Sequence, residues 1–465
     1  MIIKTNTEEF KNDLYDIIHM FYPNSELGEE DMIFNHEMLI EDDKIVNKIN
    51  LDSNDFINEQ DLIYFKSNLF KKKILKRYAK LSMYKFLSKI IGKTMPWGSL
   101  TGIRPTKLAY DLIEEGIEPV YIKETLMRNF IVSEPKAKLV AKIIANQNCI
   151  IKNDKLADIY INIPICPSRC SYCSFISAEY EQVKDLIPRY LDALVKELKS
   201  IKELVHKKSY IIRSIYIGGG TPSVLSAKEL EKIFQEINYP ISEFTVECGR
   251  PETITEEKLT ALKSAGVTRI SINPQTFCQK TLKTIGRKHT IQDVLNAYKL
   301  ALKYGFIVNM DFIAGLPGEK LSTFKKNINT ALELSPDNIT IHTLSIKHGS
   351  VMFNNPPESP ENVAKMVSYA YEKLTEDGYL PYYMYRQKNQ VEGLENVGYT
   401  KKGKICIFNV DSMEETCNII ACGAGAISKR VFQFENRIER QANPKFLSDY
   451  IQRIDEMIEN KYCLF

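Results

Sequence analysis

The sequence lacks several features that mark particular classes of protein. No run of about 18 consecutive apolar residues occurs, so no membrane-spanning helix is predicted. The first residues, MIIKTNTEEFKND, lack a basic start followed by an apolar stretch, so no signal peptide is predicted. The net charge of +3 is too small to indicate nucleic-acid binding by charge alone. We therefore expect a cytoplasmic globular protein with no membrane span and no nucleic-acid partner.

Cysteine is missing from the first part of the chain, where none precedes Cys149. The ten cysteines lie in the remaining two thirds, and a reducing cytoplasm keeps thiols free. They are therefore interpreted as metal ligands and buried apolar residues rather than as a disulfide framework. We found no internal repeat and no low-complexity segment.

Charge is unevenly distributed near the N-terminus. Residues 1–50 hold 12 acidic residues and 4 lysines, whereas residues 51–100 hold 4 acidic and 10 basic residues. The basic part centres on KKKILKRYAK, from Lys71 to Lys80. Such a run is more often a solvated helix face, and the alternative is a surface that attracts an anionic ligand or partner.

Three regions are predicted from the pattern of apolar residues. Residues 1–152 are expected to form an N-terminal accessory domain, first α+β and then mostly helical, with Trp97 in the core of a helix–helix corner. In residues 153–350, short apolar runs alternate with helical segments, which predicts parallel strands joined by right-handed crossovers. Residues 351–465 are expected to be a C-terminal region that covers the substrate. The predicted strands are 158–163, 214–219, 243–248, 269–274, 307–315 and 338–344, and the predicted helices between and after them are 189–206, 227–237, 256–265, 290–304, 321–334 and 362–377.

Six strand–helix units predict an α/β fold with a partial (β/α)6 barrel similar to a TIM barrel. In such a barrel the active residues gather at the C-terminal ends of the strands. Every chemical motif in this sequence falls just after a predicted strand, so the motifs are expected to converge.

Three cysteines follow the first barrel strand in YINIPICPSRCSYCSF, with the spacing C-x3-C-x2-C. A structural zinc site needs four ligands, commonly in two pairs, and the next cysteine after Cys173 is Cys248. Three thiolates on a four-iron cube leave one iron open to a cofactor. Cys166, Cys170 and Cys173 are therefore predicted to hold an iron–sulfur cluster. Cys406, Cys417 and Cys422 have no spacing typical of a second cluster, and CGAGAISK (422–429) is better interpreted as a glycine-rich turn.

The cysteine motif resembles the signature of the radical S-adenosylmethionine superfamily. The resemblance implies a [4Fe-4S] cluster whose open iron binds S-adenosyl-L-methionine, and radical chemistry started by the cofactor. Later motifs match in order: YIGGGTPS, TVEC, RISINPQTF, IGRKH and NMDFIAGLPGE. The resemblance assigns cofactor contacts to Gly219, Gly220, Thr221, Glu247, Gln275, Arg287 and Asp311, with Tyr160 and Phe175 flanking the adenine.

Within that superfamily the sequence resembles the oxygen-independent coproporphyrinogen III dehydrogenase-like branch. PWGSLTGIRPTKLAYDLIEEG, VECGRPETIT and YYMYRQKNQVEGLENVGY resemble members that have an extra N-terminal unit. The resemblance implies an oxidoreductase that converts two propionates of coproporphyrinogen III to vinyl groups in porphyrin biosynthesis. The alternatives are a haem-binding chaperone of the same fold and a different radical reaction, such as anaerobic opening of the haem ring. Asn162 and Phe175 depart from the dehydrogenase pattern, and the C-x-F ending is shared with both alternative branches.

A tetrapyrrole that carries carboxylates needs cationic partners and a broad apolar wall. The predicted substrate contacts are Tyr385, Arg386, Lys388 and Lys347, because an arginine can grip a carboxylate with two hydrogen bonds and tyrosines can face the macrocycle. His289, His342 and His348 are further candidates for haem ligands, although a lone histidine is more often structural. The expected partners are a tetrapyrrole, either coproporphyrinogen III or haem, and a flavodoxin- or ferredoxin-type electron donor.

Overall fold

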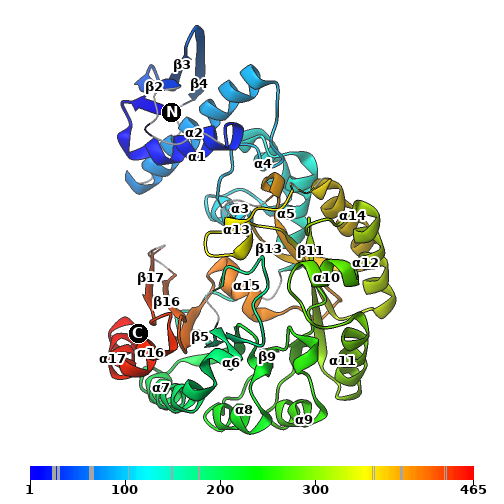
Figure 1. Ribbon diagram of the computed structural model, residues 1–465. Coiled ribbons are helices and arrows are strands. Elements are labelled where there is room, and N and C mark those ends of the chain that lie inside the picture. Colours follow the sequence, from blue (N-terminus) through cyan, green and yellow to red (C-terminus); the bar gives the residue numbers. More distant parts are fainter. Residues whose placement is uncertain are drawn as a thin grey trace. The chain divides into compact units, whose positions relative to one another are not determined.

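The structure is a computed structural model in which the chain forms two compact units, residues 1–141 and 142–465. It describes all residues except 24–27, 29–31, 62–67, 103, 148–149, 176–177, 359, 361, 388–390, 434 and 436. Each unit is described by itself below (Figure 1). Among the described residues, none of the helices is both long and apolar enough to cross a membrane.

The first unit begins with a four-stranded sheet in the order β1-β2-β3-β4. β1 and β2 are parallel, and the other two pairs are antiparallel. Alternate residues of β2 are buried, as expected for a strand that has one face against a core. That core includes Phe10, Ile17 and Phe34. The elements are β1 (Ile2–Thr5), α1 (Lys11–Phe21), β2 (Ile33–Glu41), β3 (Lys44–Leu51), β4 (Asn54–Asp61) and α2 (Asn68–Ile91).

Helices follow this sheet, which confirms the predicted change from α+β to helical structure. Trp97 is 1% exposed at the corner after α2, as expected. The next residue, Gly98, has a φ of +54°, and a Cβ there would lie 2.1 Å from the carbonyl oxygen of Phe130. Glycine is therefore required for this close approach. The helices are α3 (Pro105–Glu114), α4 (Ile122–Phe130) and α5 (Glu134–Asn146), the last of which crosses the boundary between the units.

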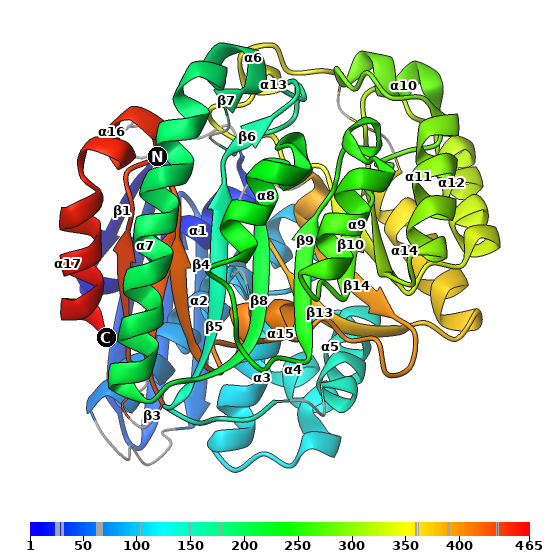
Figure 2. The same cartoon turned by 90° about the horizontal axis from the view of Figure 1, so that it is seen from below.

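The second unit contains an eleven-stranded sheet that includes the six barrel strands, which are parallel to one another. Their succession confirms the six predicted barrel strands and the partial (β/α)6 barrel (Figure 2). The strands are buried almost throughout, because the outer helices cover one face and the barrel interior the other. The strands are β5 (Leu156–Ile163), β8 (Ile211–Gly219), β9 (Glu243–Glu247), β10 (Arg269–Ser271), β11 (Ile307–Ala314) and β12 (Asn338–Thr343).

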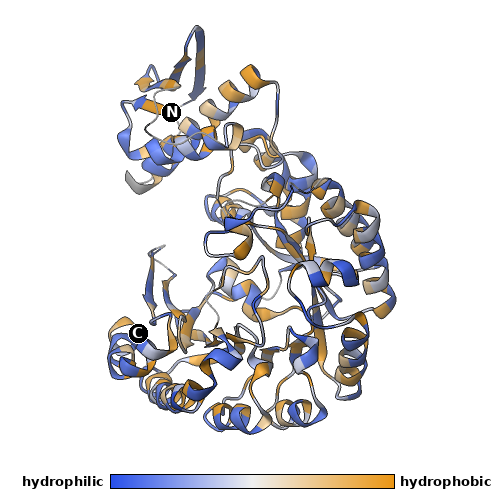
Figure 3. Ribbon diagram, in the orientation of Figure 1, coloured by the Kyte–Doolittle hydropathy of each residue, from blue (hydrophilic) through white to orange (hydrophobic). Residues whose placement is uncertain are grey.

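The outer helices are amphipathic, and each has apolar and polar residues (Figure 3). In α7 the buried residues Tyr190, Leu194, Leu198 and Ile201 recur every three or four positions and face the sheet. α8 begins with a capping box between Ser226 and Glu229, which satisfies two backbone donors at the start of the helix. The helices are α7 (Ile187–Lys208), α8 (Ala227–Phe234), α9 (Glu256–Ser264), α11 (Ile291–Lys303) and α12 (Leu321–Leu334).

The C-terminal region adds strands to both edges of the barrel sheet, which the sequence did not predict. β15 (Asn418–Cys422) pairs in parallel with β5, and an antiparallel hairpin of β16 and β17 continues that edge. At the other edge, β14 and then β13 follow β12 in antiparallel pairs. The remaining elements of this region are β13 (Leu380–Tyr385), β14 (Asn396–Thr400), β16 (Ile427–Phe432), β17 (Arg437–Ala442), α14 (Val363–Glu376), α15 (Ile407–Glu414), α16 (Leu447–Gln452) and α17 (Ile454–Leu464).

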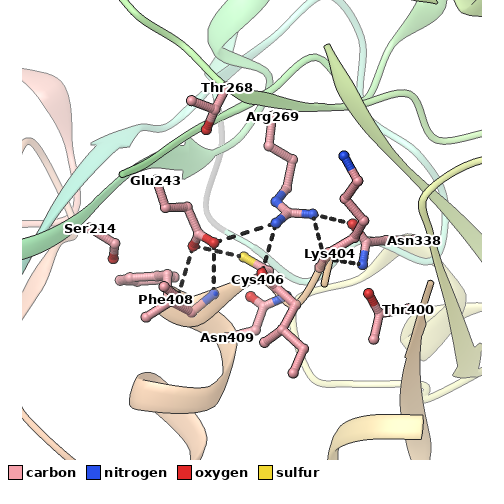
Figure 4. A network of polar contacts seen from close by, with 12 residues as sticks. Ser214, Glu243, Thr268, Arg269, Asn338, Thr400, Lys404, Cys406, Phe408 and Asn409 are labelled. Carbon is pink, nitrogen blue, oxygen red and sulfur yellow. Dashed lines mark hydrogen bonds and ion pairs between the residues drawn. The ribbon is translucent and has the colours of Figure 1, made fainter. Parts of the chain in front are cut away.

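The floor of the barrel, at the N-terminal ends of the strands, is closed by the start of α15 (Figure 4). Glu243 of β9 accepts backbone hydrogen bonds from Ile407 (2.9 Å) and Phe408 (3.1 Å). Arg269 of β10 pairs with Glu243 at 3.4 Å and donates to the backbone oxygen of Ile405 at 2.9 Å. The carboxylate therefore caps the helix, because the N-terminus of a helix favours negative charge. In this way α15 is fixed beneath the barrel interior.

Candidate functional site

The three predicted cluster ligands lie on one loop that follows β5. Cys166 ends the short strand β6 (Ile165–Cys166), which pairs with β7 (Ala178–Glu179). Cys170 is buried, and the Cys173 amide donates to the Cys170 carbonyl oxygen at 3.1 Å. The pKa of Cys173 is raised to about 11, mainly by burial and in part by the neighbouring Cys170 and Cys166 thiols. The structure thus brings the three thiols close enough to influence one another.

Two buried arginines support this loop from behind. Arg250 is 2% exposed and donates to the carbonyl oxygen (3.0 Å) and the hydroxyl (2.9 Å) of Ser168, and it lies 3.8 Å from the Cys170 sulfur. Arg287 donates to the Gly249 carbonyl oxygen at 3.2 Å, and its guanidinium also interacts with Cys170. Both guanidinium groups therefore contact the sulfur of Cys170, one of the three predicted cluster ligands. The sequence reasoning missed Arg250, although it is the arginine of the quoted stretch VECGRPETIT.

The glycines after β8 allow that strand end to pack against the cysteine loop. Gly219 has a φ of +109°, and a Cβ there would lie 2.1 Å from the Asn162 side-chain oxygen. A Cβ on Gly220 would lie 2.5 Å from the Ile165 carbonyl oxygen. The Thr221 hydroxyl lies 3.5 Å from the Cys166 sulfur. The glycines were interpreted as room for a ligand, and the structure shows that they also make room for the chain itself.

Glu247 and Asp311 are two half-buried carboxyl groups in different states. Burial raises the pKa of Glu247 to about 7, the nearby Asp311 raises it too, and the Tyr216 hydroxyl donates to it at 2.7 Å. Burial would also raise the pKa of Asp311, but hydrogen bonds from His342 and Asn309 lower it below its usual value. Asp311 is therefore ionised at neutral pH, whereas Glu247 is close to its midpoint and responds to added hydrogen-bond donors.

Gln275 presents a buried acceptor to this group of strand ends. Its φ of +65° is left-handed, and its amide donates to the Asp311 carbonyl oxygen at 2.9 Å. Its side-chain oxygen is buried and accepts no hydrogen bond from any residue that the structure describes. Buried acceptors are rarely left without a partner, so this atom fits a ligand that brings a hydroxyl or amine donor.

The two predicted adenine neighbours lie in different surroundings. Tyr160 is stacked on Phe408 of α15, with ring centroids 5.7 Å apart, and its hydroxyl donates to Asn162 at 3.0 Å. Phe408 also stacks on Tyr216 at 4.5 Å, so the floor helix supports the tyrosine that bonds Glu247. Phe175 is 65% exposed on the cysteine loop and does not join this stack.

Two of the predicted substrate contacts, Lys347 and Tyr385, lie at the mouth of the barrel. Lys347 lies 6.0 Å from the Phe175 ring centre, and burial lowers its pKa while Cys173 raises it. The Tyr385 hydroxyl lies 3.3 Å from Nδ1 of His342, whose Nε2 lies 3.6 Å from Asp311. His342 thus links Tyr385 at the mouth to Asp311, one of the predicted cofactor contacts. The sequence predicts His342 only as a candidate haem ligand, so this link was not expected.

For the other two predicted substrate contacts, the structure shows an internal hydrogen bond of Arg386 and does not describe Lys388. Arg386 donates to the Gly393 carbonyl oxygen at 3.2 Å, and burial lowers its pKa to about 10. Its guanidinium thus binds a neighbouring loop of the chain itself. Lys388 lies outside the described residues.

The basic run of α2 is largely neutralised inside the first unit. Lys72 pairs with Glu9 at 2.5 Å, and Lys73 and Arg77 both pair with Glu115, at 2.8 and 3.1 Å. Lys76 lies 3.7 Å from Asp13. These contacts favour the interpretation of an ordinary helix face over that of a partner surface.

The later cysteines are placed against different carboxyl groups of the floor. The Cys406 thiol donates to Glu243 at 3.4 Å, and the Cys417 thiol donates to Asp158 at 3.3 Å. Burial raises the pKa of both thiols above its usual range. Buried thiols that stay protonated act as hydrogen-bond donors within the fold. This role agrees with the sequence, in which the spacing of these cysteines is not typical of a second cluster.

The residues of the mouth fit the cofactors that the motifs imply. Three neighbouring thiols backed by arginines suit the iron–sulfur cluster. The unsatisfied Gln275 oxygen, together with the Glu247 and Asp311 carboxyls, suits the hydroxyls and amine of S-adenosylmethionine.

Comparison with known proteins adds three findings. Residues 160–331 match the family model described as Radical SAM superfamily. The chain is 35% identical to the "Oxygen-independent coproporphyrinogen-III oxidase-like protein HemZ" of Bacillus subtilis, over 96% of this chain and 94% of that protein. It is 29% identical to the "Heme chaperone HemW" of Escherichia coli, over 63% of this chain and 75% of that protein.

A solved structure shares the fold. The coproporphyrinogen III oxidase HemN of Escherichia coli, described as a radical SAM enzyme, superposes with a TM-score of 0.52 at 20% identity. The superposition covers 70% of this chain and 73% of that chain. At this level of identity the likeness shows the fold alone.

Proposed function

The chain belongs to the radical SAM superfamily and to the group that includes HemZ, and on this premise we propose that it is an oxygen-independent oxidoreductase. Its proposed substrate is coproporphyrinogen III, whose propionate side chains it converts to vinyl groups with release of carbon dioxide. The observation that carries the proposal is the position of Lys347. This ammonium group lies beside both Cys173 and Phe175, where it can hold a substrate carboxylate next to the cysteine loop.

The proposed roles of the cofactor residues follow from their contacts. Cys166, Cys170 and Cys173 hold the cluster, and Arg250 keeps their loop in place before the cluster arrives. Glu247, Gln275 and Asp311 orient S-adenosylmethionine, as do Gly219, Gly220 and Thr221 at the end of β8. When bound, the cluster and S-adenosylmethionine supply a radical that removes a hydrogen atom.

On the substrate side, the chain positions the propionate and accommodates the charge changes. The propionate loses one hydrogen atom from its β-carbon, one electron and carbon dioxide, and a vinyl group remains. A one-electron acceptor is needed for the electron that the substrate gives up. We assign Lys347 to the carboxylate, while the Tyr385 hydroxyl, oriented by His342, contacts the macrocycle edge.

The decisive experiment is anaerobic incubation of the reduced, cluster-loaded protein with S-adenosylmethionine and coproporphyrinogen III. Mass spectrometry is expected to show a vinyl product together with 5′-deoxyadenosine. The Lys347→Ala variant is expected to lose product while it retains the cluster absorbance, whereas Lys347→Arg retains part of the activity. Deoxyadenosine without any vinyl product would rule out this substrate.

A second candidate is a haem-binding chaperone, suggested by the similarity to HemW and by His348. This histidine is exposed on the loop after β12, with its ring 4.8 Å from that of Phe353. A chaperone would bind haem stoichiometrically without turnover, and His348→Ala would change the haem Soret band. A third outcome, an opened and methylated haem product, would indicate a different radical reaction and would be recognised by its mass.

A further inference from the structure

The turn after α10 (Gln279–Thr284) packs directly against the cysteine loop. The Ser171 amide donates to the Ile285 carbonyl oxygen at 3.1 Å, and a Cβ on Gly286 would lie 3.4 Å from the Arg169 carbonyl oxygen. Leu282 and Ile285 form a buried cluster against which Tyr172 packs. Figure 2 shows α10 at the same end of the barrel as β6 and β7. The segment 279–288 is therefore an outer wall of the predicted cluster site.

This wall has an excess of positive charge. Lys280, Lys283 and Lys288 are exposed, and they are called the α10 lysine patch here. In the part of the chain that the structure describes, no carboxylate forms an ion pair with any of these three ammonium groups. From Lys258 to Gln292 the sequence contains no aspartate or glutamate. The segment that carries the patch thus has basic residues and no acidic residue of its own.

The acidic groups nearest along the chain are already engaged. Glu252 pairs with Arg250 at 2.6 Å and lies 3.4 Å from His289. Asp293 accepts hydrogen bonds from the amide (2.7 Å) and hydroxyl (2.8 Å) of Thr290 in the capping box of α11. The field of the α10 lysine patch is therefore little compensated by its own surroundings.

The basic run of α2 provides a contrast within the same chain. Its Lys72, Lys73 and Arg77 are paired with acidic residues of the first unit. Among the described residues the α10 lysines have no such partners. Their segment is joined by a hydrogen bond to Ser171, between two of the three predicted cluster cysteines. Charge that is both uncompensated and adjacent to a redox site suits an anionic redox partner.

We propose that the α10 lysine patch is the docking surface for an acidic one-electron carrier protein of the flavodoxin or ferredoxin type. This inference rests on the proposed function in one respect, namely that the cysteine loop holds a cluster that must be reduced. In the transfer the carrier is oxidised by one electron and the cluster is reduced by one. The contact between Ile285 and Ser171 gives a direct route from the docked carrier to the loop.

Electrostatic docking predicts how fast the carrier associates with the protein and how that rate depends on salt. Clustered charge of one sign raises the association rate of an oppositely charged protein by roughly 10- to 1,000-fold at low salt. The screening length falls from about 10 Å at 0.1 M salt to about 3 Å at 1 M, so the advantage disappears as salt is added. The rate of cluster reduction by the carrier should therefore depend on both salt and the three lysines.

The test uses the cluster-loaded protein and reduced, purified flavodoxin as the probe. Stopped-flow bleaching of the cluster absorbance gives the reduction rate, and electron paramagnetic resonance confirms the reduced cluster. The Lys280→Glu/Lys283→Glu/Lys288→Glu variant is expected to be reduced at least ~10-fold more slowly than the wild type at low salt. The difference is expected to vanish near 1 M salt.

A matched control reverses three exposed lysines at the other end of the barrel, Lys202 and Lys207 near the end of α7 and Lys299 near the end of α11. Its reduction rate is expected to stay within twofold of the wild type. A neutral photoreductant, deazaflavin, needs no docking and is expected to reduce all three proteins equally. Equal reduction of wild type and patch variant by flavodoxin would overturn the proposal.

A binding measurement keeps the inference testable apart from the cluster. If deazaflavin also reduces the cluster of the patch variant slowly, the docking role of the patch is tested by the affinity of labelled flavodoxin for the cluster-free proteins. Weaker, salt-sensitive binding to the variant supports the docking surface, and equal affinity contradicts it. Because neither readout uses the tetrapyrrole, failure to form a vinyl product would count against the proposed function alone.

Discussion

The mouth and the floor of the barrel are built from the same strands but have different polar chemistry. At the floor, Glu243 and Arg269 bind each other and the backbone at the start of α15. At the mouth, the Gln275 oxygen is buried without a hydrogen-bond donor from the described residues, and Glu247 has a pKa raised to about 7. At the floor, Glu243 and Arg269 thus neutralise each other's charge. At the mouth, the Gln275 oxygen remains open to a ligand that brings a donor.

This difference separates stability from function along a single strand. β9 begins with Glu243 in the floor and ends with Glu247 at the mouth, only four positions later. Conserving the geometry of the floor requires its partners to stay paired, since an unpaired buried charge is costly. The proposed cofactor would supply the contacts that the mouth lacks in the empty protein. The two ends should therefore respond differently to mutation, and four changes test this.

The largest effect is expected from Cys170→Ala at the mouth. Loss of one of three thiolates is expected to abolish the visible absorbance of the reconstituted cluster, while the far-ultraviolet circular dichroism stays unchanged. The control is Cys463→Ala, an exposed cysteine near the C-terminus, which should keep the full absorbance. An intact cluster in Cys170→Ala would show that the ligands were wrongly assigned.

Removal of Arg269 tests the floor. Arg269→Met leaves Glu243 buried without its cation, which is expected to cost about 3–5 kcal/mol in the free energy of unfolding. Denaturant unfolding measures this loss, and the folded variant should still bind a cluster. Lys303→Met, which removes the exposed pair between Lys303 and Glu256, should leave stability nearly unchanged. A stable Arg269→Met variant would contradict the structural role of the floor.

Glu247→Gln should weaken cofactor binding but stabilise the empty protein. A charge-assisted hydrogen bond contributes about 1.5–3 kcal/mol, so the affinity for S-adenosylmethionine should fall roughly tenfold or more. Because burial raises the pKa of Glu247 from 4.5 to about 7, the wild type loses stability as the pH rises between these values. The variant has no such group.

The unfolding free energies of the empty wild type and Glu247→Gln should therefore agree near pH 4.5 and differ in favour of the variant at pH 8. Equilibrium dialysis at the same two pH values measures cofactor affinity. If the stability gap is independent of pH, Glu247 is not the half-buried acid described here.

The smallest change is expected for Tyr216→Phe. It removes one hydroxyl donor to Glu247, worth about 1 kcal/mol, and leaves the aromatic stack with Phe408 in place. Cofactor affinity should fall about fivefold, while the midpoint of denaturation changes little. Tyr304→Phe, which changes a half-buried tyrosine at the end of α11, provides the comparison. A larger loss in Tyr304→Phe would show that the effect is not specific to the mouth.

The local elements of the barrel could be predicted from the sequence because their signals are local. Strands such as β5 and β11 are short apolar runs, and helices such as α7 have regularly spaced apolar residues. The cysteine spacing likewise fixed the loop and its three thiols. The pairing of β15 with β5 could not be predicted, since Asn418 and Ala157 are brought together only by the folding of a chain segment of more than 250 residues.

Several contacts of the candidate site likewise could not be predicted, because their residues are far apart in the sequence. Arg250 reaches Cys170 across 80 positions, and Phe408 reaches Tyr216 across nearly 200. The sequence predicts Arg386 as a substrate contact, and only the fold showed that its guanidinium also donates to Gly393. A motif states which groups are present near a strand end, but packing determines what each of them touches.

The sequence by itself therefore determined the order of strands and helices, the three thiols and the succession of motifs after the strands. Each of these depends on the spacing of residues within a short stretch of chain. Over such a stretch, the periodicity of the backbone and the turn-forming residues determine the local structure. Only the tertiary structure decided that α15 closes the floor beneath Tyr160, that Arg250 supports the cysteine loop, and that α10 lies outside it. Those outcomes depend on long-range packing, in which side chains distant in sequence compete for the same space.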